Sequence, residues 1–220
     1  MIKISEMNLK GVMFDVDGTL LDTMTAWHDD GARYLARFGI EAEPGLGDIL
    51  FAETALSGAQ YLIDHYGLSL SREEVAAGVT REMEDFYREE AMPKPGAVAL
   101  LEALADRNIP MTVVTSTDGR CIDDAFRRLG LHRFFQGIYS AGDMKTTKSE
   151  PVIYRTAAGR MGTAAKETYL FDDGLYALKA AKSFGYGTVG VYDSVSEADQ
   201  PEIRRTADYY VNGLEELVLA

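Results

Sequence analysis

Two acidic residues separated by one position follow an apolar run near the start of the chain. Residues 12–14, Val-Met-Phe, suit a strand buried on both faces, and Asp15 and Asp17 come directly after it. In an extended strand this spacing points both carboxylates the same way, where like charges repel unless a cation or a proton intervenes. A divalent metal resolves the repulsion most simply, and Mg²⁺ prefers carboxylates, carbonyls, water and substrate phosphate as ligands. The alternative is a solvated turn, since Gly18 lets the backbone leave the strand.

Two later apolar runs also end in polar side chains. Thr115 and Ser116 end one run, where hydroxyl and backbone N–H groups can hold phosphate oxygens, or can simply cap the following helix. Asp172 and Asp173 end another, and by themselves they could be a favourable helix N-terminus. Because parallel strands bring their carboxyl ends to one edge of a sheet, these groups are predicted to meet the first acidic pair there.

Composition limits the classes of ligand and the compartment. The chain has 220 residues, 46% of them apolar, so it can bury a globular core, and its net charge of −13 disfavours a nucleic-acid partner. Cys121 is the single cysteine, which excludes an intrachain disulfide, favours a packing role and suits a reducing compartment. No apolar stretch approaches the roughly 20 residues of a membrane span, so we expect a cytoplasmic protein without a membrane partner.

The stretch after the first acidic pair is predicted to be helical throughout. The apolar spacing predicts a helix over residues 22–38, a second helical stretch closing at Gly67, and a third helix opened by a capping box at Ser71 and Glu74. Pro93-Lys94-Pro95-Gly96 marks the end of this region. Residues 21–93 are therefore predicted to form an inserted helical cap domain that roofs the carboxyl edge of the sheet.

Strands and helices alternate in the rest of the chain. This order predicts an α/β fold, a doubly wound parallel sheet formed by residues 1–20 and 94–220. The predicted helices are Val98–Arg107, Cys121–Leu129, Pro151–Met161, Leu175–Phe184 and Leu214–Leu219, and the predicted strands are Ile109–Val114, Gly137–Tyr139, Thr168–Phe171 and Thr188–Val191.

The run Asp15-Val16-Asp17-Gly18-Thr19-Leu20 resembles the first signature of the haloacid dehalogenase-like superfamily, most of whose members are magnesium-dependent phosphatases. The resemblance implies that Asp15 is a nucleophile that becomes an aspartyl-phosphate, and that Asp17 is the general acid and base. Dehalogenases of the superfamily lack the second Asp, so Asp17 argues against carbon–halogen cleavage. The family core is Rossmann-like, and a helical cap is inserted where this chain has its helical stretch.

Three further motifs of the superfamily can be found in order. Thr115 matches the second, a lone Thr or Ser after an apolar strand, and Lys148 resembles the third. The resemblance implies that Thr115 and Ser116 bind phosphate and that Lys148 neutralises the nucleophile and the phosphoryl group. Ser149 stands where relatives have a Pro, which leaves Lys145 as a competitor for the role of Lys148.

The pair Asp172-Asp173 resembles the fourth motif. The resemblance implies that Asp173 is a direct or water-bridged Mg²⁺ ligand together with Asp15 and the backbone carbonyl of Asp17. Asp172 is expected either to support the metal ligands without contacting Mg²⁺, or to contact it through a water molecule. Some relatives add a further Asp, which here is Ala177.

The function implied is a magnesium-dependent phosphomonoester hydrolase acting on a small phosphorylated metabolite such as a sugar phosphate or phosphoglycolate. The alternatives are a beta-phosphoglucomutase-like sugar phosphomutase and a non-catalytic binding module. The mutase would want a His near the first motif, but His28 falls one position beyond that register and Trp27, expected to be a buried aromatic, takes the place. His65 and His132 are expected at the surface, and the protein is expected to be a monomer or weak homodimer.

Overall fold

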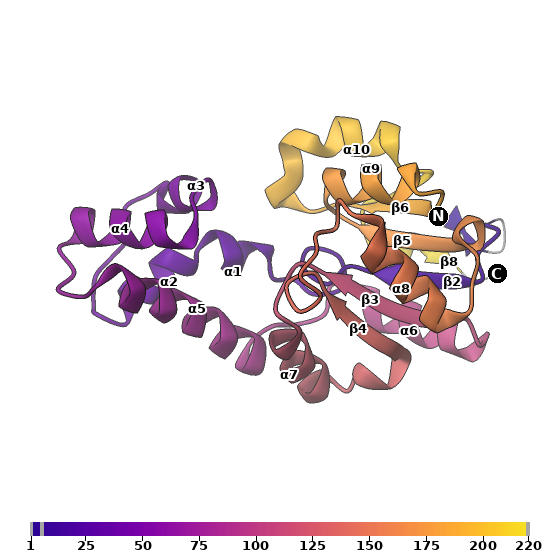
Figure 1. The fold of residues 1–220 in the computed structure, drawn as a ribbon, viewed down its shortest axis with the longest axis horizontal. Coiled ribbons are helices and arrows are strands. Elements are labelled where there is room, and N and C mark those ends of the chain that lie inside the picture. Colours follow the sequence, from indigo (N-terminus) through magenta and orange to yellow (C-terminus); the bar gives the residue numbers. More distant parts are fainter. Residues whose placement is uncertain (1, 5–6, 219–220) are drawn as a thin grey trace. The chain divides into compact units, whose positions relative to one another are not determined.

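The computed structural model describes residues 2–4 and 7–218, which group into two compact units (Figure 1). The core unit consists of Met1–Asp22 and Met92–Ala220, and the helical unit consists of Thr23–Ala91. The two connections leave the core unit side by side, since Asp22 N donates to Met92 O at 2.9 Å. Each unit has its own apolar interior and is described by itself.

The core unit is built on a six-stranded sheet whose paired strands are all parallel, in the order β4-β3-β2-β5-β6-β7. The strand following β2 in the chain lies on one side of it and β5 lies on the other, so the winding direction reverses at β2. In open α/β sheets ligands bind outside the carboxyl ends of the strands at such a reversal. The strands are β2 (Gly11–Phe14), β3 (Met111–Thr115), β4 (Phe135–Ser140), β5 (Thr168–Asp172), β6 (Gly187–Val191) and β7 (Tyr209–Val211).

Strand β2 lies in the middle of this sheet because all its residues are buried and apolar or small. Alternation along the strand sends successive side chains to opposite faces. Met13 joins an apolar cluster with residues of α8 (Pro151–Met161) and α9 (Leu175–Ser183). Phe14 packs on Phe171, with ring centroids 4.9 Å apart, and edge-on against Phe135. A core therefore lies on each side of the strand that carries the first acidic pair.

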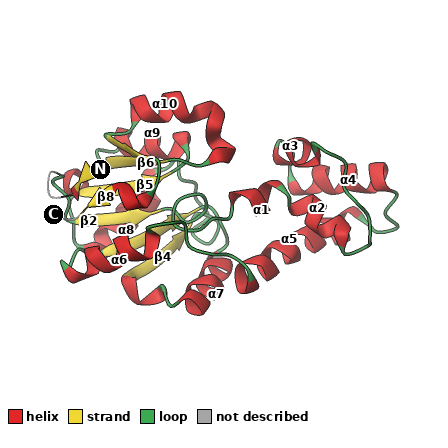
Figure 2. Ribbon diagram, turned by 180° about the vertical axis from the view of Figure 1, so that it is seen from behind, coloured by secondary structure: helices red, strands yellow, loops and turns green. Residues whose placement is uncertain are grey.

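The helices of the core unit cover both faces of the sheet (Figure 2). Because crossovers between parallel strands are right-handed, the helices that lead from β2 to β3 to β4 lie on one face. The helices that lead from β4 back across the sheet to β5, and then on to β6 and β7, lie on the other face. The first group is α6 (Ala97–Asp106) and α7 (Gly119–Leu129), and the second is α8, α9 and α10 (Gln200–Thr206).

The predicted fold class is confirmed, and the end of the chain differs from the prediction. The helix predicted over Leu214–Leu219 is wrong: Leu214–Glu216 is a single 3₁₀ turn, and β8 (Leu217–Val218) pairs in parallel with β1 (Ile2–Lys3). Leu219 lies outside the described residues. The apolar spacing there reflects pairing with the other end of the chain, and such long-range pairing overrides local helical preference. The sequence did not predict α10, which is short and largely polar, or β7, which has only three residues.

The helical unit is all-helical, as predicted: every one of residues 23–91 is described, and none lies in a strand. The helix predicted over 22–38 is interrupted at Asp29, whose φ and ψ of −100° and 13° are not helical. Thr54 begins a new helix inside the second predicted stretch, while the Ser71 capping box is confirmed, with Glu74 N donating to Ser71 Oγ. The helices are α1 (Met24–His28), α2 (Asp30–Ala36), α3 (Leu46–Phe51), α4 (Ala55–Tyr66) and α5 (Arg72–Glu89).

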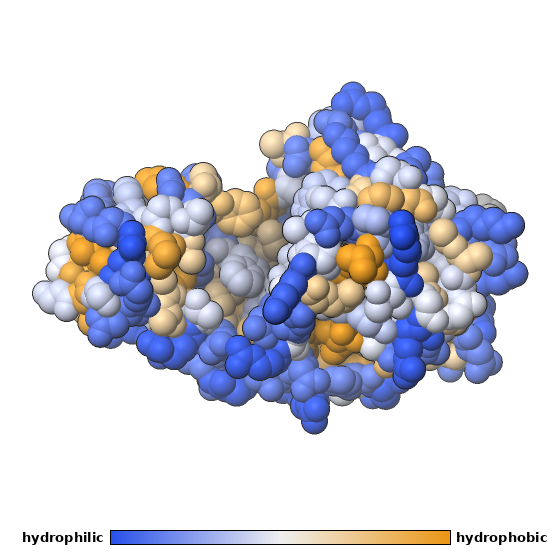
Figure 3. Space-filling model, viewed as in Figure 1, coloured by the Kyte–Doolittle hydropathy of each residue, from blue (hydrophilic) through white to orange (hydrophobic). Residues whose placement is uncertain are grey.

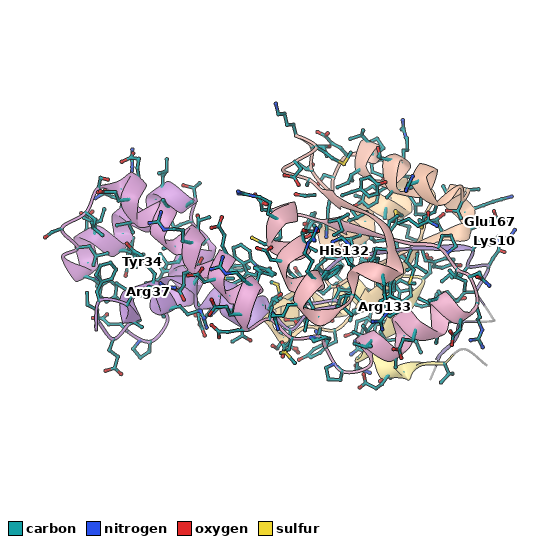
Figure 4. The ribbon with its side chains drawn as sticks, turned by 90° about the horizontal axis from the view of Figure 1, so that it is seen from below. Lys10, Tyr34, Arg37, His132, Arg133 and Glu167 are labelled. Carbon is teal, nitrogen blue, oxygen red and sulfur yellow. The ribbon has the colours of Figure 1, made fainter. Side chains whose placement is uncertain are left out.

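A cluster of buried side chains holds these helices together. Tyr34 and Leu35 of α2 meet Leu62 of α4 and Val75 of α5. Tyr34 approaches α5 closely because Gly78 has no side chain: a Cβ there would lie 2.3 Å from the Tyr34 ring. Arg37, the C-cap residue that follows α2 (Figure 4), pairs with Glu82 of α5. Packing of α2 on α5 therefore combines an apolar seam with an ion pair at its rim.

The face of each unit seen in Figure 3 mixes hydrophilic and apolar residues. His65 and His132 are partly exposed beside Glu43 and Asp123, as expected for surface residues. Cys121 is buried, in agreement with a packing role. Within the part of the chain that the structure describes, no helix is both long and apolar enough to cross a membrane.

Replacing Gly96 by Ala is expected to lower the free energy of unfolding by about 3 kcal/mol, because two costs coincide. Gly96 has φ of +80°, and an added Cβ would lie 2.4 Å from the backbone nitrogen of Glu215. Gly162 is the matched control: its φ is +71° and nothing lies within 4 Å of an added Cβ. Gly162→Ala should cost about 1 kcal/mol from strain alone. Urea unfolding of both variants measures the difference, and equal losses would contradict the proposed backbone contact.

Candidate active site

Three carboxylates from two neighbouring strands converge at the carboxyl edge of the sheet. Asp15 follows β2, and its backbone N–H donates to Phe171 O at 2.9 Å, which extends the pairing of β2 with β5 to the tip. Asp172 ends β5 and Asp173 follows it. One oxygen of each carboxylate lies within 4.8 Å of the others, and the three residues are only 1–6% exposed. The two acidic strand ends picked out in the sequence thus form one buried cluster.

A buried lysine is paired with this cluster. Lys148 Nζ lies 2.5 Å from Asp15 Oδ1 and 2.9 Å from Asp172 Oδ2, and Lys148 is 3% exposed. Its loop is held from inside the core, because Tyr154 OH of α8 donates to Lys148 O at 2.5 Å. Lys145, the competing candidate, is exposed. The structure therefore brings Lys148, and not Lys145, to the carboxylates.

One ammonium is not enough to balance three buried carboxylates. Burial raises the pKa of Asp15 well above its usual value, with Asp172, Asp173 and Asp17 adding to the rise against the pull of Lys148. Burial and then Asp172 raise the pKa of Asp173 to about 7. For Lys148, burial lowers the pKa, but Asp15 and Asp172 outweigh it and raise the pKa above its usual value. Buried oxygen donors with an excess of negative charge fit a hard divalent cation such as Mg²⁺.

The stability of the metal-free protein should therefore fall as the pH rises through the acid range. The pKa of Asp173 rises from 3.8 to about 7 on folding, so its contribution is fully present below the lower value and is lost as the pH approaches the upper one. Across that window the folded protein keeps a proton that the unfolded chain has released. The pKa of Asp15 is also raised on folding, so Asp15 contributes to stability in the same direction.

Urea unfolding with a chelator present, at about pH 5 and about pH 7.5, measures this loss, which should be on the order of a few kcal/mol. The control is Asp173→Asn, which cannot titrate and should weaken the dependence, leaving the part that Asp15 contributes. Equal stability of the unsubstituted protein at the two pH values would contradict the assigned charge excess.

The carboxylate of Asp17 has a different partner. Thr117 Oγ1 donates to Asp17 Oδ2 at 2.6 Å, while the Thr117 backbone N–H donates to Thr115 Oγ1 at 3.1 Å. Thr115 is buried at the end of β3, and Ser116 is exposed with its hydroxyl 3.1 Å from Tyr176 OH. Thr115 and Ser116 were predicted from the sequence, but Thr117 was not. The only signal was a third hydroxyl in the same run, and its long-range partner could not be read from the chain.

The loop after β2 also reaches the second acidic strand end. Thr19 is fully buried, and its hydroxyl donates to Asp173 Oδ1 at 3.4 Å. Gly174 N donates to Asp172 Oδ1 at 2.8 Å, so both oxygens of Asp172 have protein donors. The arrangement can therefore present a carboxylate nucleophile, a neighbouring ammonium, a separately held second carboxylate and a cation site at one edge.

The chain is similar to known phosphatases and to solved structures of related enzymes. The chain is 27% identical over 215 residues to hexitol phosphatase A of Escherichia coli, covering 97% of this chain and 95% of the relative. It is 25% identical over 190 residues to the phosphorylated carbohydrates phosphatase of Thermotoga maritima, covering 86% and 88%. A crystal structure from Thermotoga maritima, provisionally assigned as a beta-phosphoglucomutase, has a TM-score of 0.83 and 25% identity and covers 94% of this chain and 96% of that one.

The family model described as haloacid dehalogenase-like hydrolase matches residues 9–185, which include the strand ends that carry Asp15, Thr115 and Asp173 and the loop of Lys148. A match over this share of the chain, joined to the parallel sheet and its buried carboxylates, identifies an enzyme. The chain belongs to the haloacid dehalogenase-like hydrolase family.

Proposed function

We propose that the chain is a magnesium-dependent phosphomonoester hydrolase that acts on a small phosphorylated carbohydrate through an aspartyl-phosphate intermediate. The observation that carries the proposal is the buried group of Asp15, Asp172 and Asp173 with Lys148 at the reversal point of the sheet. The substrate class is supported by the relatives, which are named for hexitols and phosphorylated carbohydrates.

In the proposed reaction Asp15 attacks phosphorus, forming an O–P bond while the bond to the leaving oxygen breaks. Asp17 gives its proton to the leaving alkoxide, and then takes a proton from the water that attacks the phosphoenzyme and releases Asp15 and inorganic phosphate. Lys148 Nζ, 2.5 Å from Asp15 Oδ1, orients the nucleophile and offsets charge on the phosphoryl oxygens. Thr115 and Ser116 stand at the end of β3 as the proposed phosphate-binding hydroxyls.

Asp15 and Asp173, with the backbone carbonyl of Asp17, would hold Mg²⁺. Bound Mg²⁺ supplies charge stabilisation for the phosphoryl oxygens. Asp172 already accepts hydrogen bonds from Lys148 Nζ and Gly174 N. This supports a role in which Asp172 orients Lys148 and does not contact Mg²⁺ directly. We further propose residues 21–93 as the cap domain, which would exclude bulk water from the phosphoenzyme.

The test is phosphate release from a panel of hexitol, hexose and pentose phosphates and phosphoglycolate, with Mg²⁺ and with a chelator. Mg²⁺ should be required, and activity lost to the chelator should return when Mg²⁺ is added in excess. Asp173→Asn should raise the Mg²⁺ concentration needed for half-maximal activity. No turnover of any monoester, or full activity with the chelator present, would reject the proposal.

A sugar phosphomutase is the second candidate, favoured by the structural likeness to the provisional beta-phosphoglucomutase. Within the helical unit, Trp27 is half-buried and its Nε1 donates to Tyr87 OH at 2.8 Å, while His28 lies 3.0 Å from Asp48 Oδ1. These partners give His28 a role inside its own unit, which supports hydrolysis over transfer to a sugar hydroxyl. Phosphorus NMR separates the two: isomerised sugar phosphate that accumulates faster than free phosphate would establish the mutase.

A further inference from the structure

Lys94 is a part-buried cation outside the four family motifs. It follows Pro93 where the second connection enters the core unit, and its side chain is 15% exposed. Nζ donates to Gly18 O at 2.7 Å, to Tyr192 O at 2.9 Å and to Asp193 Oδ2 at 2.9 Å. An ammonium has three donors, so these three oxygens match its full capacity. Lys94 therefore joins two segments that are far apart in the sequence, one at Gly18 and one at residues 192–193.

One of those segments is the turn that carries the proposed acid and base. Gly18 has φ of +75°, and its carbonyl belongs to the peptide that leads into Thr19, the residue that donates to Asp173. Asp17 is its other neighbour. The hydrogen bond from Lys94 to the Gly18 carbonyl fixes the orientation of the backbone between Asp17 and Thr19. It therefore limits how far the side chain of Asp17 or of Thr19 can move relative to Asp15.

The other partner of Lys94, Asp193, is held rigidly. Asp193 is 6% exposed; its Oδ1 accepts from Val195 N at 3.0 Å, and its backbone carbonyl accepts from Gln200 Nε2 at 3.2 Å. Gln200 in turn accepts from Tyr210 OH at 2.7 Å. Asp193 is therefore held in place independently of Lys94, and Lys94 has two separable effects: it balances a buried charge, and it holds the Gly18 carbonyl.

We infer that Lys94 is a positioning residue, which fixes the Asp17–Thr19 turn through the Gly18 carbonyl and uses Asp193 as its anchor. This inference rests on the proposed function, because Asp17 is there the acid and base. Lys94 lies outside the phosphate-binding and metal-binding groups, so its loss should affect the chemical step more than substrate binding. A misplacement of about 1 Å in such a group costs on the order of 100-fold in rate.

The experiment compares kcat and KM for the best phosphate ester of the wild-type panel. Lys94→Met should lower kcat by about 10- to 100-fold, with KM and the inhibition constant of inorganic phosphate within about threefold. The double variant Lys94→Met with Asp193→Asn removes the unpaired buried charge but not the loss at Gly18, so its kcat should stay low. The matched control is Lys182→Met, since Lys182 Nζ also donates to a backbone carbonyl, Thr206 O, and to an Asp, Asp208, each at 2.7 Å.

The outcomes separate the two proposals. An inactive wild-type protein rejects the proposed function and the role of Lys94 with it. An active wild type with unchanged kcat in Lys94→Met rejects the role of Lys94 alone. Recovery of kcat in the double variant would assign Lys94 to charge balance instead, and loss of folding in both variants, seen by circular dichroism, would assign it to stability; either result overturns positioning.

Discussion

Substitution of Asp15 by Asn is expected to lower kcat by about four orders of magnitude or more, because the amide lacks the nucleophilic oxygen anion on which the proposed reaction depends. Residual turnover would come from the remaining binding groups alone. Initial rates of phosphate release, measured at saturating Mg²⁺, give the ratio. Rapid acid quenching with a ³²P-labelled ester adds a second readout: labelled protein should form with the wild type and not with Asp15→Asn.

The loss should not arise from unfolding. Asp15 is one of three buried carboxylates that compete for a single ammonium, so an amide in its place reduces repulsion while Lys148 keeps its bond to Asp172. The metal-free variant should thus be within about 1 kcal/mol of the wild type, or more stable. Asp22→Asn is the matched control, since Asp22 is exposed and should keep kcat within about twofold. Comparable activity of Asp15→Asn and wild type would remove the nucleophile from the proposal.

Substitution of Lys148 by Met is expected to change both activity and stability. Nζ contacts Asp15 and Asp172 in a site with almost no exposure, so its removal leaves two buried carboxylates without their cation. Breaking a buried pair in this way costs about 3 to 5 kcal/mol, and loss of the ammonium beside the phosphoryl group should lower kcat by about 1000-fold. Thermal unfolding with and without Mg²⁺ and steady-state kinetics measure the two effects.

Lys145→Met provides the comparison, because the two lysines lie three positions apart and only Lys148 is buried. Lys145→Met should leave kcat within about twofold and the free energy of unfolding within about 0.5 kcal/mol. A larger loss of activity in Lys145→Met than in Lys148→Met would reverse the assignment of the cation. A stable Lys148→Met protein that has lost activity would show that a proton or another cation can neutralise the buried aspartates in place of Lys148.

Much of the core could be predicted because its signals are local. The apolar run before Asp15 and the alternation of strands and helices determine a parallel sheet, and the carboxyl ends of its strands then meet at one edge. That rule alone predicts that Asp15 and Asp173 lie close together. The break at Asp29 could not be predicted, because apolar spacing continues across it and only the dihedral angles depart from the helix.

The chain by itself determined which chemistry is available: paired carboxylates after buried strands, hydroxyls after another, and lysines in the loop that precedes a helix. Only the tertiary structure decided which groups act on which. Lys148 rather than Lys145 reaches the acids, Thr117 reaches Asp17 across 100 positions, and Lys94 joins Gly18 to Asp193. The physical reason is that strand and helix patterns arise from neighbours in sequence, whereas a hydrogen bond or ion pair between distant residues exists only where packing brings donor and acceptor within about 3 Å.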